Sequence, residues 1–152
     1  MMLKKQSISL IGFLVLCFCL LIPGDAWGAI ATGNILQQIP REVTITLGNS
    51  ANELKFEPSD IEFQAGQRYK LHLTNPSQQK HYFTAKDFAD IIWTQKVDAG
   101  RVEIKGAIHE LELRPGTEAD WVFVPLKPGK YNLRCPIAGH TEAGMVGEIV
   151  VN

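Results

Sequence analysis

The sequence predicts an all-β domain, a sandwich or barrel of short strands, on three observations. Apolar and polar residues alternate in many short runs, which is the pattern of strands with one buried face. Proline or glycine follows most of these runs and marks a turn. The chain has 152 residues, a length that suits one domain with its own core and leaves no room for several.

The first residues have the pattern of a secretory signal peptide. Lys4 and Lys5 precede an apolar run over residues 8–22, and small residues stand at positions −3 and −1 of a cut before Ala29. The run is 15 residues long, whereas a membrane-spanning helix needs about 20. Cleavage is therefore favoured, and a retained membrane anchor is the alternative.

Removal of this leader changes the inventory of soft side chains. The full chain has three Cys, three Met and four His, with a net charge of −1. After cleavage one cysteine, Cys135, one methionine, Met145, and all four histidines remain. A disulfide within the domain is then excluded, and the near-zero charge argues against nucleic acid as a partner. We divide the chain into a signal peptide (1–28), a flexible lead-in (29–40) and one domain (41–152).

Strands are expected where apolar side chains recur at every second position. In the first half of the domain these runs are residues 43–47, 54–56, 61–63 and 69–73. In the second half they are residues 111–113, 121–123, 131–133 and 146–151. Their number and short length favour a sandwich or barrel.

One stretch departs from this alternation. Residues 84–87 have capping-box spacing, and Phe88, Ile91 and Ile92 fall on one face of a helix. The sequence therefore predicts a short helical excursion over about residues 85–93, followed by a loop that ends at Gly100.

The segment that carries the chemistry joins the last two predicted strands. It presents Cys135, His140 and Met145 at the spacing C-x4-H-x4-M, and His81 ends an earlier polar loop. Two imidazoles, a thiolate and a thioether are the donors of a blue-copper electron-transfer site. Zinc sites use thiolate and imidazole but rarely a thioether. Each of these residues taken singly could have a purely structural role, such as a buried core thiol, but their joint spacing favours a copper site.

The other two histidines are not expected to bind metal. His72 lies on the polar phase of its strand, which indicates a solvated surface role. His109 shares its phase with Leu111 and Leu113, which indicates a partly buried structural histidine.

Residues 135–151 resemble the copper loop of the cupredoxins, the type 1 blue copper proteins of the plastocyanin, azurin and rusticyanin kind. Residues 56–66, 75–83 and 121–131 resemble other parts of that family, so the resemblance covers about residues 43–152. It implies a cupredoxin-like Greek-key β-sandwich that binds one type 1 copper ion. The implied equatorial ligands are His81, Cys135 and His140, and the implied axial ligand is Met145.

The same resemblance implies an exported electron carrier that cycles between Cu(I) and Cu(II). Redox partners would dock transiently near His140, inside an apolar patch drawn from its neighbours: Pro136, Ile137, Ala138, Ala143 and Val146. The expected compartment is a periplasm or a thylakoid-type lumen, with membrane contact only if the N-terminal segment is retained.

A copper chaperone and a copper enzyme are the alternatives to an electron carrier. A periplasmic copper chaperone or storage module would use the same four ligands, although the domain has no Met-rich or His-rich tract. A copper enzyme is not expected, because the sequence has no His-x-His pair and no second cysteine near Cys135.

Overall fold

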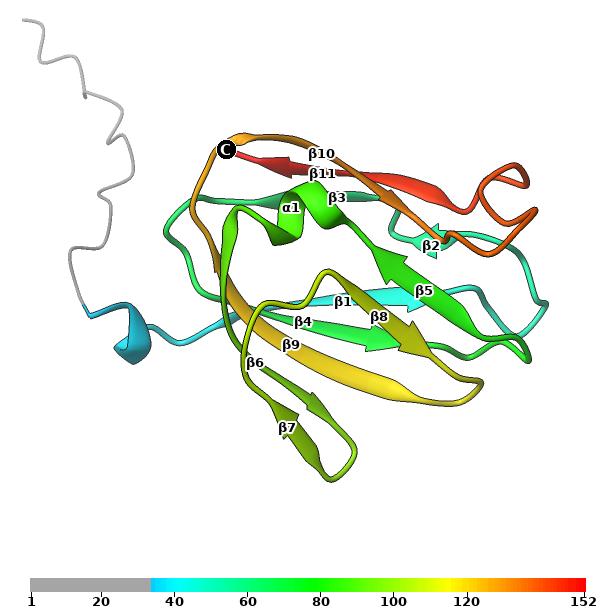
Figure 1. The fold of residues 1–152 in the computed structure, drawn as a ribbon, viewed down its shortest axis with the longest axis horizontal. Helices are drawn as coiled ribbons and strands as arrows, with labels where there is room; N and C mark the ends of the chain where they lie inside the picture. The colour runs from blue at the N-terminus through cyan, green and yellow to red at the C-terminus, as the bar shows by residue number, and fades with distance from the viewer. Residues whose placement is uncertain (1–33) are drawn as a thin grey trace, which may run out of the picture.

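The computed structural model describes residues 34–152, which form two β-sheets packed face to face (Figure 1). The predicted signal peptide, residues 1–28, and the first part of the predicted lead-in lie outside the described residues. Within residues 34–152 no helix is long and apolar enough to cross a membrane.

The first sheet runs in the order β2-β1-β4-β9-β6-β7, and the second in the order β3-β11-β10-β5-β8. The strands of the first sheet are β2 (Phe56–Glu57), β1 (Arg41–Leu47), β4 (Tyr69–Thr74), β9 (Glu118–Pro125), β6 (Ile92–Ala99) and β7 (Val102–Ile104). The strands of the second are β3 (Asp60–Phe63), β11 (Val146–Val151), β10 (Gly129–Arg134), β5 (His81–Thr84) and β8 (Glu110–Leu113).

The chain crosses repeatedly from one sheet to the other. It leaves the β1–β2 hairpin for β3 in the second sheet, returns in β4, and crosses again to β5. The pairs β1–β4 and β3–β11 are parallel, and the other paired strands are antiparallel. These crossovers are of the Greek-key kind, so the predicted all-β sandwich is confirmed.

The core lies between the sheets and consists of the alternating side chains that the sequence singled out. In β4, Tyr69, Leu71 and Leu73 are buried, and the residues between them are half-exposed. Aromatic rings fill the middle of the sandwich, where Phe123 packs edge-on against Phe63 at 5.3 Å between ring centroids. Both sheets are thus anchored to one rigid core, which supports the loops at the ends of the strands.

The helical excursion is shorter than predicted. Helix α1 (Lys86–Ala89) has a single turn, and β6 begins at Ile92. The predicted capping box is wrong, because the Thr84 hydroxyl donates to the Glu110 carboxylate at 2.7 Å and does not cap the helix. The predicted loop before Gly100 is also wrong, since that segment pairs with β9 and turns at Gly100 (φ +61°) into β7.

The described part of the lead-in contains a short 3-10 helix, η1 (Ile35–Gln37). The Arg68 guanidinium donates to the carbonyls of Leu36 at 3.1 Å and Gln38 at 2.8 Å. These bonds tie this segment to the start of β4.

Candidate metal centre

His81 is the first residue of β5 and is fully buried, opposite Leu113 of β8. The polar loop before it is organised around the buried side chain of Asn75. The Asn75 amide donates to the carbonyls of Gln79 at 2.7 Å and Leu113 at 2.8 Å. Its oxygen accepts from the main-chain N–H of Ser77 at 3.0 Å and from the Ser77 hydroxyl at 2.7 Å. Asn75 thus fixes the loop before His81, and this loop places the His81 side chain inside the sandwich.

The loop between β10 and β11 is closed by main-chain hydrogen bonds between the predicted ligands. The N–H of Cys135 donates to the carbonyl of Met145 at 3.1 Å, and the N–H of Met145 donates to the carbonyl of His140 at 2.9 Å. The Thr141 hydroxyl also donates to the Cys135 carbonyl at 2.8 Å. The loop turns at Gly144, whose φ of +103° favours a residue without a side chain.

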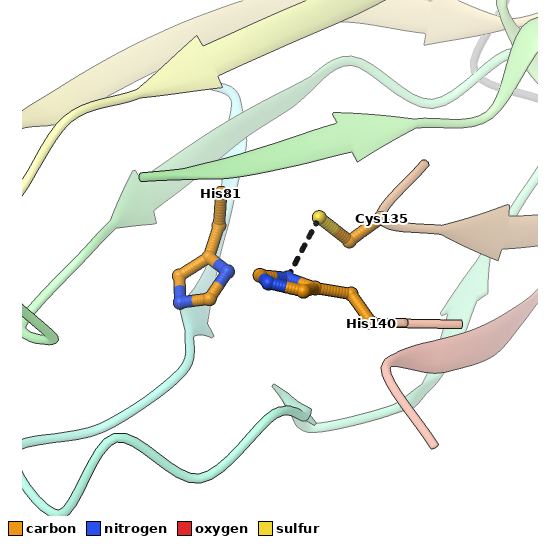
Figure 2. Close-up of side chains that lie close together, drawn as sticks. All are labelled: His81, Cys135 and His140. Carbon is orange, nitrogen blue, oxygen red and sulfur yellow. Dashed lines mark hydrogen bonds between the residues drawn. The ribbon is translucent and has the colours of Figure 1, made fainter. Parts of the chain in front are cut away.

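These two loops bring His81, Cys135 and His140 together (Figure 2). One potential ligand atom from each residue lies within 4.8 Å of the others. The Cys135 sulfur is 3.5 Å from His140 Nδ1, and the two imidazole rings are 5.1 Å apart between centroids. His81 and Cys135 are fully buried, and His140 is 7% exposed. Three of the four predicted ligands therefore meet at one point with only the His140 edge near solvent.

Met145, the fourth predicted ligand, is fully buried immediately before β11. Its main chain is hydrogen-bonded to both Cys135 and His140. The loop thus fixes the backbone of Met145 next to the other two predicted ligands that it supplies.

The surroundings of His81 favour the form of this side chain that binds a metal ion. Burial, followed by the nearby charge of His140, lowers the pKa of His81 below its usual value and keeps this imidazole neutral. Within residues 34–152 neither ring nitrogen of His81 has a hydrogen-bond partner, although both are buried. The main-chain N–H of Tyr82 donates to the Cys135 sulfur at 3.4 Å, which holds this sulfur beside β5.

A metal ion would satisfy one of the two buried nitrogens of His81 that lack a protein partner in residues 34–152. A cysteine sulfur and a thioether in the same loop, with two imidazoles, suit copper better than harder cations. The residues present therefore fit one copper ion of the type 1 kind.

The remaining two histidines lie away from this cluster. His72 faces outward from the first sheet, with its Nδ1 2.7 Å from the Asp120 carboxylate. His109 is exposed, with its Nε2 2.7 Å from the Asp90 carboxylate. The predicted partial burial of His109 is wrong, because it precedes β8 and the alternation of that strand does not extend to it.

Sequence reasoning missed three residues around the cluster: Gly48, Ser77 and Thr141. Gly48 follows β1 and lies against His81, 33 positions away in the chain, so no local spacing reveals it. Thr141 lies beside His140 in the sequence, and its hydroxyl could have been considered as a brace for the loop.

Comparison with known proteins gives the same assignment. The model of the Cupredoxin-like domain matches residues 11–151. The chain is 32% identical to a chloroplastic plastocyanin of Fritillaria agrestis over 130 residues. It is 27% identical to the copper-resistant cuproprotein CopI of Rubrivivax gelatinosus over 140 residues. Each alignment covers 85% of this chain and 71% of the relative.

Solved structures agree at the level of the fold. Reduced auracyanin from Roseiflexus castenholzii superposes with a TM-score of 0.53 at 19% identity, covering 76% of this chain and 99% of auracyanin. A copper-containing nitrite reductase from Thermus scotoductus gives a TM-score of 0.60 at 13% identity, covering 77% of this chain and 32% of the reductase. With the family model spanning nearly its whole length, the chain belongs to the cupredoxin-like family.

Proposed function

We propose that this protein is an exported mononuclear type 1 copper protein that transfers single electrons between redox partners. His81, Cys135 and His140 would be the equatorial ligands and Met145 the axial ligand. The observation that carries the proposal is the buried cluster of one cysteine sulfur and two imidazoles, whose ligand atoms lie within 4.8 Å of one another. Bound copper would supply a one-electron Cu(II)/Cu(I) couple at this point.

The protein itself supplies a fixed and dry environment for these donors. Hydrogen bonds among Cys135, His140 and Met145 hold the loop in one arrangement, and the Asn75 network holds the loop before His81. Burial excludes water from all but the edge of His140. Donors held in this way need little rearrangement when the charge at the site changes, which suits an electron carrier.

The edge of His140 is the proposed electron port. The side chains of Pro136, Ala138 and Ala143 are exposed beside it in the loop, and Val146 is 44% exposed. Such a surface fits small, transient contacts of the kind that redox partners make. We propose a periplasm or a thylakoid-type lumen as the compartment, with a membrane tether only if the N-terminal segment is retained.

A copper chaperone or storage module is the second candidate, since the relative CopI is described as a copper-resistant cuproprotein. It would use the same ligands. A carrier keeps its copper through repeated oxidation and reduction, whereas a chaperone releases Cu(I) to a competing chelator or partner. Repeated redox cycles in the presence of a Cu(I) chelator separate the two.

The nitrite reductase and multicopper oxidases with this fold do not lead us to propose an enzyme. This chain spans 32% of the nitrite reductase and 30% of a multicopper oxidase from Campylobacter jejuni. In residues 34–152, His81, Cys135 and His140 form one such metal-ligand cluster, and we propose a single-copper role for it.

The test is the visible spectrum of the purified protein titrated with Cu(II). We expect an intense copper–thiolate band at about 600 nm, as soft thiolate ligation produces. Cys135→Ser removes the thiolate and should abolish the band. His72→Ala is the matched control, because His72 lies outside the cluster, and should leave the band unchanged. A colourless wild-type complex would refute the proposal.

A further inference from the structure

The imidazole ring of His81 has an unusual environment for a histidine that would bind a metal ion. A metal-binding histidine almost always donates its second ring N–H to a carboxylate, a carbonyl or a water, which fixes the ring orientation. In the described part of the chain His81 has no such partner at either nitrogen. Figure 2 shows one nitrogen directed toward Cys135 and His140 and the other directed away. No protein group of residues 34–152 fixes this ring through a hydrogen bond.

Gly48 lies against Nε2 of His81, the ring nitrogen that is directed away from Cys135 and His140. It is buried directly after β1, with φ +73°. A Cβ atom added at Gly48 would lie 2.8 Å from Nε2 of His81 and 3.1 Å from Cβ of Ser77. The first distance is shorter than real Cβ contacts, so the space occupied by the ring exists because residue 48 has no side chain.

The backbone at Gly48 is itself held in place. Its N–H donates to the Lys55 carbonyl at 2.8 Å. The Asn49 side-chain oxygen accepts from the N–H of Glu53 at 3.1 Å, and that of Asn52 accepts from the N–H of Gln78 at 2.8 Å. The loop carrying Gly48 is thus tied both to itself and to the loop that precedes His81. A methyl group at position 48 would therefore displace the ring before it displaced the backbone.

We propose that Gly48 is a positioning residue for His81, and that close packing of its bare backbone against Nε2 sets the orientation of the ring. The coordinating consequence of this inference rests on the proposed function, whereas the packing contact does not. A side chain at position 48 would displace the ring from this orientation and weaken the metal site.

The first experiment uses the metal-free protein and a double-mutant cycle. Gly66→Ala is the matched control for Gly48→Ala, because Gly66 has φ +76° and no atom within 4 Å of an added Cβ. Both variants carry the backbone strain, and only Gly48→Ala carries the clash. We expect Gly48→Ala to lower the urea midpoint more than Gly66→Ala does. His81→Gly should remove most of that excess, because coupled neighbours are non-additive.

An excess loss that persists undiminished in the His81→Gly background would overturn the inference. If Gly48→Ala does not fold on its own, His81→Gly is expected to restore folding of the double variant. Failure of that rescue would also overturn the inference.

The second experiment measures copper binding. We expect Gly48→Ala to bind Cu(II) at least about tenfold more weakly, as loss of support around a ligand typically does, and to shift the copper–thiolate band. Gly66→Ala should retain both the affinity and the band of the wild type. A wild type without the band refutes the proposed function and leaves the metal-free cycle as the test of the contact. A blue wild type with Gly48→Ala matching Gly66→Ala refutes the role of Gly48.

Discussion

Asn75→Ala is the substitution for which the structure makes the sharpest prediction on stability. Asn75 is 1% exposed, and its side chain makes four hydrogen bonds, two as donor and two as acceptor. These bonds join the loop before His81 to the end of β8. Alanine would leave the carbonyls of Gln79 and Leu113 and the N–H of Ser77 without this partner.

The magnitude follows from the number of bonds. A net contribution of about 1 kcal/mol for each bond gives about 4 kcal/mol in total. In the variant the single proton of the Ser77 hydroxyl can turn to the Gln79 carbonyl, 2.9 Å away, which offsets part of the loss. We therefore expect Asn75→Ala to lower the free energy of unfolding of the metal-free protein by about 3 kcal/mol.

Urea denaturation followed by tryptophan fluorescence measures this loss, because Trp121 is buried in the core. Asn132→Ala is the control, since Asn132 is exposed in β10 and such surface changes stay within about 0.5 kcal/mol. A loss below about 1 kcal/mol for Asn75→Ala would refute the view that this side chain holds the loop.

Three further predictions concern the metal loop and the metal itself. Met145→Leu keeps an apolar side chain of similar volume, so the metal-free protein should lose less than about 1.5 kcal/mol. Loss of the thioether should nevertheless shift the copper–thiolate band, and an unchanged spectrum would exclude Met145 as a ligand. Thr141→Val removes the hydroxyl that donates to the Cys135 carbonyl and should cost about 1 kcal/mol in urea denaturation; no loss would mean that the bond is not formed. Copper at about 100 times its dissociation constant should stabilise the wild type by about 2.7 kcal/mol, seen as a higher midpoint in calorimetry, and His81→Ala should reduce this shift.

The sequence predicted the sandwich because its strands carry their signal locally. Period-two alternation over residues 69–73 depends only on which face of β4 is buried, and the structure buries that face. The helix failed for the opposite reason. The hydroxyl of Thr84 is near enough in sequence to cap α1, but its partner is Glu110, which β5–β8 pairing brings alongside it. A competing partner 26 positions away is not visible in a local pattern.

The residues of the metal site also differ in whether a local sequence pattern could predict them. Cys135, His140 and Met145 lie in one loop, so their spacing alone indicated a shared site. His81 lies 54 positions before Cys135, and its assignment came from the chemistry of a blue-copper site and from resemblance to the family. Gly48 has no chemical signature in the sequence, because its contribution is the absence of a side chain at a point that only folding defines.

Because the donors come from two separate segments of the chain, the metal site forms only when the chain folds. His81 stands at the start of β5 and Cys135 directly after β10, and these two strands pair through Thr84 and Arg134. The Tyr82 N–H reaches the Cys135 sulfur only when that pairing is made. The complete donor set therefore exists in the folded sandwich and not in the unfolded chain. By linkage, copper binding adds to folding stability.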